Sequence, residues 1–198
     1  MRAVFVALLL MLCSFPLHAA EPSIADEIAF EDPYTGFRFP VLLAAYKFHG
    51  VRRHGQPRLG YSVEYVEIAG STASIIVYDL DETGIENGTS DPRVQREFHK
   101  IDSAIQSLVD QRAYRSVIRD DSLQSLSKAW LQSNHEIEMP GRTMLHSHSF
   151  IRGQNGRLVK IRITTPSDGA YARLPTFLSG VSRSIGMLGN RTTTAEAR

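Results

Sequence analysis

The sequence predicts an α+β protein, in which a mostly antiparallel sheet is flanked by two main helices as an α-β-α sandwich. Three observations lead to this prediction. Residues 59–80 contain two strand-like runs joined by a short polar turn. Residues 92–110 carry one apolar stripe with helical spacing. A second pair of strand-like runs, at 143–165, precedes another helical stripe at 174–188. Strands, helix, strands and helix in this order are typical of an α+β fold.

Residues 1–20 have the features of a secretory signal peptide. Arg2 precedes an apolar run of about ten residues, and Ala19 and Ala20 stand just before the polar Glu21. The apolar run is too short to span a bilayer, which needs about twenty residues. We therefore expect a mature protein that is periplasmic or secreted, that is soluble and that has no transmembrane segment.

The only cysteine, Cys13, lies inside this signal peptide. Lipid attachment requires a small residue before the cysteine, and Leu12 stands there, so the sequence favours soluble export over a lipid anchor. The mature chain should have neither disulfides nor thiol chemistry. Removing Arg2 from the 22 basic residues leaves 21, equal to the 21 acidic residues. This balance argues against a nucleic-acid partner, because nucleic-acid-binding domains are normally strongly basic.

The mature chain begins with polar residues, and we expect a flexible lead-in at 21–31 and a single α+β domain over 32–189. A turn that contains Pro and Gly precedes a short strand at 37–39. A second short strand is expected at 46–51, followed by a basic loop.

An antiparallel hairpin is predicted for the runs 59–68 and 73–80. The first run alternates apolar with polar residues, as in a strand with one wet face. The second run is apolar on both faces from Ile75 to Tyr78, as in a strand that is covered on both sides. Gly70 lies in the short connection between them.

The clearest helix is expected from Pro92 to Asp110. Asp91 can cap this helix, and Pro92 suits its first position. The apolar stripe consists of Val94, Phe98, Ile101, Ile105 and Leu108.

The segment 113–134 fits both a helix and a strand. Its apolar residues recur at near-helical steps, yet 129–133 reads equally well as a strand. The two runs after it, 143–151 and 156–165, flank Gly153-Gln-Asn-Gly156 and predict a hairpin. Because such strands need a neighbour in the sheet, we interpret the segment around Trp130 as extended.

A second amphipathic helix is predicted over 174–188, with Gly189 just past its end. Gly180 and Gly186 fall inside the predicted helix, where each would lower its stability by about 1 kcal/mol relative to Ala. A close approach to the sheet would explain both glycines. The polar tail at 190–198 is expected to be disordered.

Several stretches together carry a family resemblance: 32–40, the strand 75–78, the helix 91–110, the strand 160–164 and the last helix. Their order resembles that of the PsbP-like superfamily, whose namesakes are extrinsic subunits of photosystem II. The chain is also similar to uncharacterised exported bacterial proteins. This resemblance implies a sheet flanked by helices and a non-catalytic binding or assembly role, and it transfers no catalytic residue.

His146 and His148 are the best candidates for metal ligands. Two residues apart in a predicted strand, both imidazoles should project from one face about 6–7 Å apart. That spacing can close on one Zn²⁺ or Cu²⁺, and a third ligand could come from His135, Glu136 or Glu138. The alternative is that both rings are half-buried structural side chains with hydrogen-bond partners.

Four basic residues form a weaker candidate site for an anion. Arg52 and Arg53 lie in the basic loop, while Lys160 and Arg162 share one face of a predicted strand. Together they could receive a phosphate or a carboxylate. The alternative is that each is a solvated surface charge.

Sequence signs of catalysis are lacking. No serine occupies a Gly-x-Ser-x-Gly turn, and no Gly-rich phosphate loop is present, so we expect no cofactor. The sequence favours an exported, soluble, non-enzymatic binding or assembly module with an unknown protein or small-molecule partner. The alternative function is a metal-binding protein or metal-dependent enzyme that uses His146 and His148.

Overall fold

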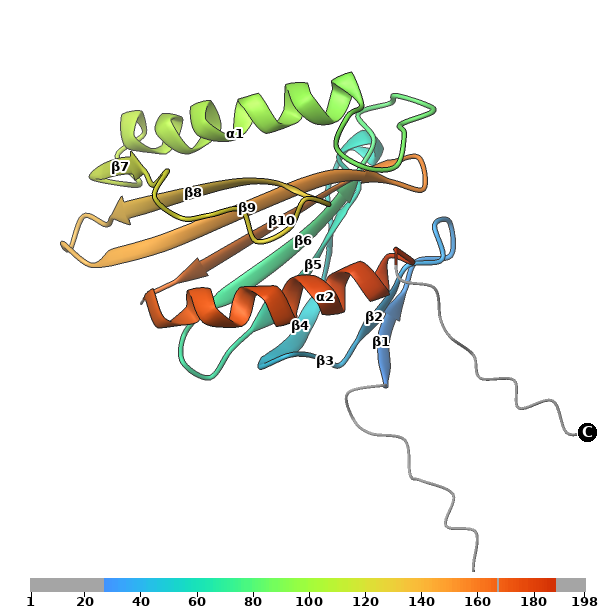
Figure 1. Cartoon of the computed structure of the whole chain (residues 1–198), viewed down its shortest axis with the longest axis horizontal. Coiled ribbons are helices and arrows are strands. Elements are labelled where there is room, and N and C mark those ends of the chain that lie inside the picture. Colours follow the sequence, from blue (N-terminus) through green and yellow to red (C-terminus); the bar gives the residue numbers. More distant parts are fainter. Residues whose placement is uncertain (1–26, 167, 188–198) are drawn as a thin grey trace, which may run out of the picture.

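The computed structural model describes residues 27–166 and 168–187, and a large antiparallel sheet runs through the middle of them (Figure 1). Its strands lie in the order β3-β4-β5-β6-β10-β9-β8-β7. Their bounds are β3 Leu42–Leu43, β4 Tyr46–Arg53, β5 Tyr61–Val66, β6 Thr72–Tyr78, β7 Ser116–Arg119, β8 Leu131–Glu138, β9 Met144–Gln154 and β10 Arg157–Thr165. A separate two-stranded sheet pairs β1 (Ile28–Glu31) with β2 (Arg38–Pro40).

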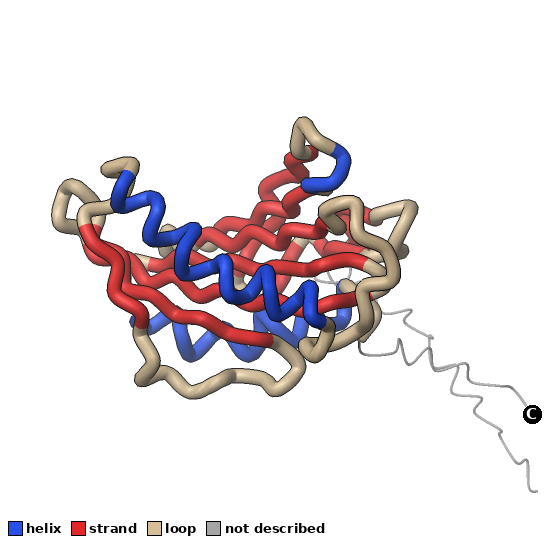
Figure 2. The backbone as a smooth tube through the Cα atoms, turned by 90° about the horizontal axis from the view of Figure 1, so that it is seen from above, coloured by secondary structure: helices blue, strands red, loops and turns tan. Residues whose placement is uncertain are grey.

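The helices α1 (Pro92–Asp110) and α2 (Leu174–Ser184) cover opposite faces of the large sheet (Figure 2). We call these the α1 face and the α2 face. α1 contacts β7, β8 and β9, whereas α2 contacts β2 and β3 and follows the short 3-10 helix η3 (Asp168–Arg173). The predicted α+β class and α-β-α sandwich are therefore confirmed.

The central hairpin shows how the sheet separates two hydrophobic cores. β5 and β6 pair antiparallel, with Val63 opposite Ile75. Ile75 and Val77 belong to the core under α2, whereas Ile76 and Tyr78 belong to the core under α1. The prediction of a strand covered on both sides is thus confirmed for β6.

The bounds of α1 agree with the predicted helix. The Asp91 side chain caps it by accepting a hydrogen bond from the Arg93 backbone nitrogen, at 2.8 Å. Val94, Ile101 and Ile105 of the predicted stripe are buried against the α1 face of the sheet. The same packing places Asp102 next to β8, where its side chain contacts Ser133 and His135.

The structure differs from the sequence-based expectations near the start of the domain and in the segment 113–134. Residues 28–31, expected in the flexible lead-in, form β1. Within 113–134 the chain forms β7, then a loop, and enters β8 only at Leu131. The extended interpretation is confirmed from Leu131 onward and is wrong for Trp130, which lies in a bend before the strand.

The second predicted hairpin is confirmed as β9 and β10, and its turn is tighter than the sequence suggested. Gln154 pairs with Arg157, so only Asn155 and Gly156 connect the strands. Both have positive φ, 49° and 75°, as the tightest hairpin turns require.

The second helix is shorter than predicted. It ends at Ser184, and Gly186 follows it with a φ of 76°, which a residue with a side chain rarely adopts. Gly180 lies where α2 approaches the sheet, because an added Cβ would stand 2.8 Å from Leu43 Cδ2. The close approach is confirmed for Gly180 and is wrong for Gly186.

Three expectations fall outside the described residues: the signal peptide at 1–20, the continuation of the last helix to 188 and the tail at 190–198. Within the described ranges, no helix is long and apolar enough to cross a membrane.

Candidate functional site

A polar network lies between α1 and the β7 end of the sheet. Asp102, on α1, accepts hydrogen bonds at 3.0 Å from the Ser133 hydroxyl and from His135 Nε2. Arg119 of β7 forms an ion pair with the same carboxylate and also contacts Asp121 Oδ1 through Nε at 2.7 Å. Helix α1 is therefore tied to β7 and β8 by one shared carboxylate.

The ionisation states follow from burial and partners. Burial alone would raise the pKa of Asp102, but hydrogen bonds from Ser133 and Arg119 outweigh it and hold that pKa below its usual value. The His135 side chain is buried, and burial lowers its pKa. An ionised carboxylate only accepts hydrogen bonds, so Nε2 carries the proton of a neutral imidazole. His135 Nδ1 then points a lone pair into the interior, with no hydrogen-bond partner among the described residues.

Ser, His and Asp meet in this network, but their arrangement is not that of a nucleophilic triad. In a triad the hydroxyl bonds to the imidazole, which takes its proton. Here the Ser133 hydroxyl donates to Asp102, and among the described residues no hydroxyl bonds to His135 Nδ1, the other imidazole nitrogen. The geometry fits a structural role, in which these side chains connect α1 to β7 and β8.

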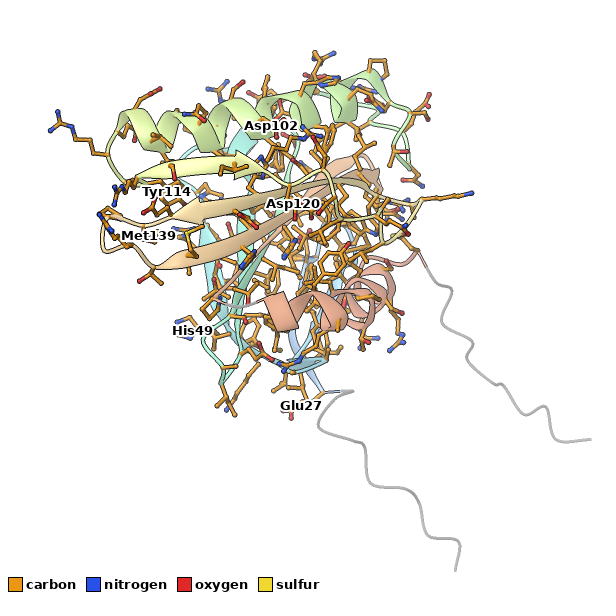
Figure 3. The ribbon with its side chains drawn as sticks, turned by 60° about the vertical axis from the view of Figure 1, so that its left-hand side comes forward. Glu27, His49, Asp102, Tyr114, Asp120 and Met139 are labelled. Atoms are coloured by element: carbon orange, nitrogen blue, oxygen red, sulfur yellow. The ribbon has the colours of Figure 1, made fainter. Side chains whose placement is uncertain are left out.

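Beside this network a hollow of about 350 Å³ opens where β7 ends and leaves the edge of β8 uncovered. We call it the β8-edge hollow. Its apolar lining comes from Phe98, Leu123, Trp130 and Leu131. Its polar lining includes Arg119, Asp120, Asp121, Gln132, Ser133 and Asn134. Figure 3 shows Asp102 on α1 and Asp120 in the loop after β7 on the same side of the molecule.

One wall of the hollow is the backbone edge of β8. The Asn134 carbonyl accepts a hydrogen bond of 2.9 Å from the Asp120 backbone nitrogen, so the Asn134 carbonyl points away from β9. Backbone groups alternate along a strand, and the N–H and C=O of Gln132 therefore point to the same outer edge. Neither group has a hydrogen-bond partner within 27–166 and 168–187.

A buried arginine packs against Trp130, one of the residues that line the hollow. Arg152, on the α2 face of β9, is 7% exposed and lies over the Trp130 ring at 5.6 Å. Its guanidinium donates to the carbonyl oxygens of Gly153 and Ala129 and to Gln154 Oε1, at 3.0–3.2 Å. The bond to Ala129 fixes the end of the loop that borders the hollow.

His146 and His148 share the α2 face, as predicted, but their surroundings differ. His148 is buried, its Nδ1 lies 2.9 Å from Asn134 Oδ1, and its ring packs against Tyr171. His146 stands opposite Glu136. His135 cannot join them, because it projects from the opposite face of β8. In the part of the chain that the structure describes, no group of three or more His, Cys, Asp or Glu side chains is placed to hold a metal ion.

The four basic candidates do not form one site. Arg52 and Arg53 are consecutive in β4 and so point to opposite faces, and Arg52 pairs with Glu64 at 3.4 Å. Lys160 and Arg162 do share the α1 face, but they have separate contacts. Lys160 Nζ lies over the Tyr78 ring, and Arg162 donates to the Tyr114 hydroxyl at 2.8 Å.

The residues that form the polar network and the hollow do not stand out as a site in the sequence. Asp102 lies outside the apolar stripe of its predicted helix, and the sequence offers His135 only as a possible third metal ligand. One signal was available. Gln132–Glu136 is a run of polar residues that starts inside the segment interpreted as extended. A strand there has polar residues on both faces, and buried polar groups need hydrogen-bond partners.

Comparison of the chain with protein-family models, with curated proteins and with solved structures finds no match. The resemblance to the PsbP-like superfamily therefore stays a prediction.

Proposed function

We propose that the protein is a non-enzymatic binding module that acts in the periplasm or after secretion, and that its ligand occupies the β8-edge hollow. Support for export comes from the signal-like residues 1–20. Support for binding comes from the hollow, which combines an apolar floor with a few convergent polar groups, as ligand sites usually do. Its volume of about 350 Å³ lies toward the small end of such sites.

The observation that carries the proposal is the early end of β7. β7 pairs with β8 only along residues 135–138, and the first half of β8 borders the hollow instead. An uncovered strand edge beside aromatic side chains is a place where a partner gains both hydrogen bonds and apolar contact. The metal alternative at His146 and His148 has no comparable observation in its favour among the described residues.

Trp130 allows a direct test, because it is the only tryptophan in the chain and lines the hollow. The probe is N-phenyl-1-naphthylamine, an uncharged aromatic dye that accepts excitation energy from tryptophan. We expect saturable binding to the purified protein, with quenched Trp130 emission and increased dye emission. Ser125→Tyr, which adds a ring at the lining of the hollow, should abolish this signal.

Ser103→Tyr is the matched control, because it adds the same ring at an exposed position on α1. It should bind the dye as the unmodified protein does. Absence of saturable binding, or equal binding by Ser125→Tyr, would contradict the proposal.

A further inference from the structure

The outer edge of β8 has hydrogen-bonding capacity that the described chain does not use. At Gln132, the backbone N–H donor and C=O acceptor both point toward the β8-edge hollow, and neither has a partner in the described ranges. A donor and an acceptor on one residue of a strand match the pair that an extended peptide presents. A ligand with only one type of polar group would leave the other unmatched.

The charge around the hollow favours a basic ligand. Arg119 is already engaged by two carboxylates, Asp102 and Asp121. Asp120 receives hydrogen bonds from the Ser122 backbone nitrogen and hydroxyl, both at Oδ1. These bonds lower the Asp120 pKa, so the carboxylate stays ionised at neutral pH. With one guanidinium and two carboxylates in its lining, the hollow has a net negative formal charge.

Apolar contact is available next to this charge. Phe98 and Leu131 lie toward the α1 face, and Leu123 and Trp130 close the hollow from the loop side. Because side chains of an extended peptide alternate between two directions, one residue can place its charge near Asp120 while its neighbours contact the apolar lining.

We propose that the β8-edge hollow binds a short extended peptide segment that pairs with the backbone of Gln132 and places a basic side chain against Asp120 and Asp121. The inference depends on the proposed binding function, because it names the ligand class of the same hollow. The peptide lies along the first half of β8, beyond the end of β7, so the sheet gains one more short strand on binding. This is strand addition at a sheet edge.

The test measures binding of three capped tripeptides to the purified protein by calorimetry, with Trp130 emission as a second readout. The probe is Ac-Val-Lys-Val-NH2. Its first control is the same peptide with every amide nitrogen methylated, which removes the donors that a strand needs. Its second control is Ac-Val-Glu-Val-NH2, which reverses the charge. We expect the lysine peptide to bind at least about tenfold more tightly than either control.

Two variants locate the charge. Asp120→Asn keeps an Oδ1 acceptor for Ser122 but removes the negative charge, and it should weaken binding of the lysine peptide by about tenfold. Asp110→Asn removes one charge at the exposed end of α1 and should change binding by less than about twofold at 0.15 M salt. Binding of the uncharged dye should be unaltered in Asp110→Asn, which lies outside the lining of the hollow.

The outcomes separate the two proposals. If the dye binds but the methylated peptide binds as tightly as the lysine peptide, the binding site stands and strand addition is wrong. If Asp120→Asn leaves binding of the lysine peptide unchanged, the basic ligand class is wrong. If neither dye nor peptide binds, the hollow is not a binding site and both proposals fail.

Discussion

At the scale of single residues, the most informative group is the buried imidazole of His135. Its Nε2 is bonded to Asp102, while Arg119 of β7 and Arg162 of β10 both disfavour a second positive charge nearby. A protonated ring would also bring an N–H to Nδ1, which has no hydrogen-bond partner among the described residues. A buried donor without a partner is unfavourable. The neutral ring is thus the form that the folded protein selects.

We predict that stability decreases as the pH falls below about 6.5, the usual histidine pKa in an unfolded chain. Burial lowers the pKa of His135 in the folded state. Between the two pKa values the unfolded chain binds a proton that the folded protein does not, so the free energy of unfolding falls with decreasing pH. The contribution of His135 to the free energy of unfolding is complete above about pH 6.5. Between the two pKa values it falls by up to about 1.4 kcal/mol per pH unit as the pH decreases.

Urea denaturation between pH 7.5 and 5.0 measures this slope. His135→Gln should flatten it, because glutamine does not titrate, whereas His49→Gln at an exposed position should not. Asp102 and Asp120 do not interfere, because their pKa values are held below the usual aspartate range. An identical slope in His135→Gln and the unmodified protein would show that this histidine titrates freely.

At the scale of elements, one close contact joins the loop before α1 to strand β9. Gly88 and Gly153 exchange two backbone hydrogen bonds, at 2.9 and 2.8 Å. A Cβ added to Gly153 would overlap the carbonyl oxygen of Glu86, a backbone atom that cannot rotate away. This contact positions the chain that leads to the Asp91 cap, and it explains why glycine stands inside a long strand.

Gly153→Ala should therefore destabilise the protein by about 2–4 kcal/mol, through overlap and loss of the paired hydrogen bonds. Gly50→Ala is the matched control, since Gly50 also lies in a strand and an added Cβ meets nothing within 4 Å. Its effect should be within about 1 kcal/mol. Chemical denaturation of both variants measures the difference. Equal midpoints would mean that the loop around Glu86 shifts to accept the added Cβ without a loss of stability.

At the scale of the whole molecule, the two cores are coupled because they share one sheet. Val77 is buried under α2 and Ile101 under α1, and strands β6, β10 and β9 supply residues to both cores. Disrupting the sheet from either face removes the support of the other helix. Such single domains usually unfold in one cooperative transition.

We predict one unfolding transition that is seen identically by far-ultraviolet circular dichroism and by Trp130 emission. Val77→Ala and Ile101→Ala should each shift this transition by about 1–4 kcal/mol through lost burial and a cavity. Val66→Ala, at a side chain that is 37% exposed, should shift it by less than about 1 kcal/mol. Two separate transitions, or a variant that moves only one probe, would contradict coupling through the sheet.

The sequence by itself determined the elements whose signals are local. The stripe and the Asp91 cap defined α1. Alternation defined β5, and a run that is apolar on both faces defined β6. Gly153-Gln-Asn-Gly156 marked the last hairpin turn, and the structure narrows it to Asn155 and Gly156, both at positive φ. The sequence also predicted that His146 and His148 share a face, since side chains alternate with a period of two.

Only the tertiary structure decided the candidate site. Asp102 and His135 are 33 residues apart and meet because α1 packs across β7 and β8. Arg52 and Arg53 point to opposite faces because both lie inside β4. His135 and His148 point to opposite faces because of the register between β8 and β9. Neither the extent of β4 nor this register follows from the sequence. The hollow exists because β7 ends at Arg119, which pairs with His135, while β8 begins four residues earlier at Leu131. Neither segment's own sequence shows where its neighbour in the sheet begins or ends. Local periodicity encodes how a segment folds, whereas a site depends on which segments become neighbours and where each one stops.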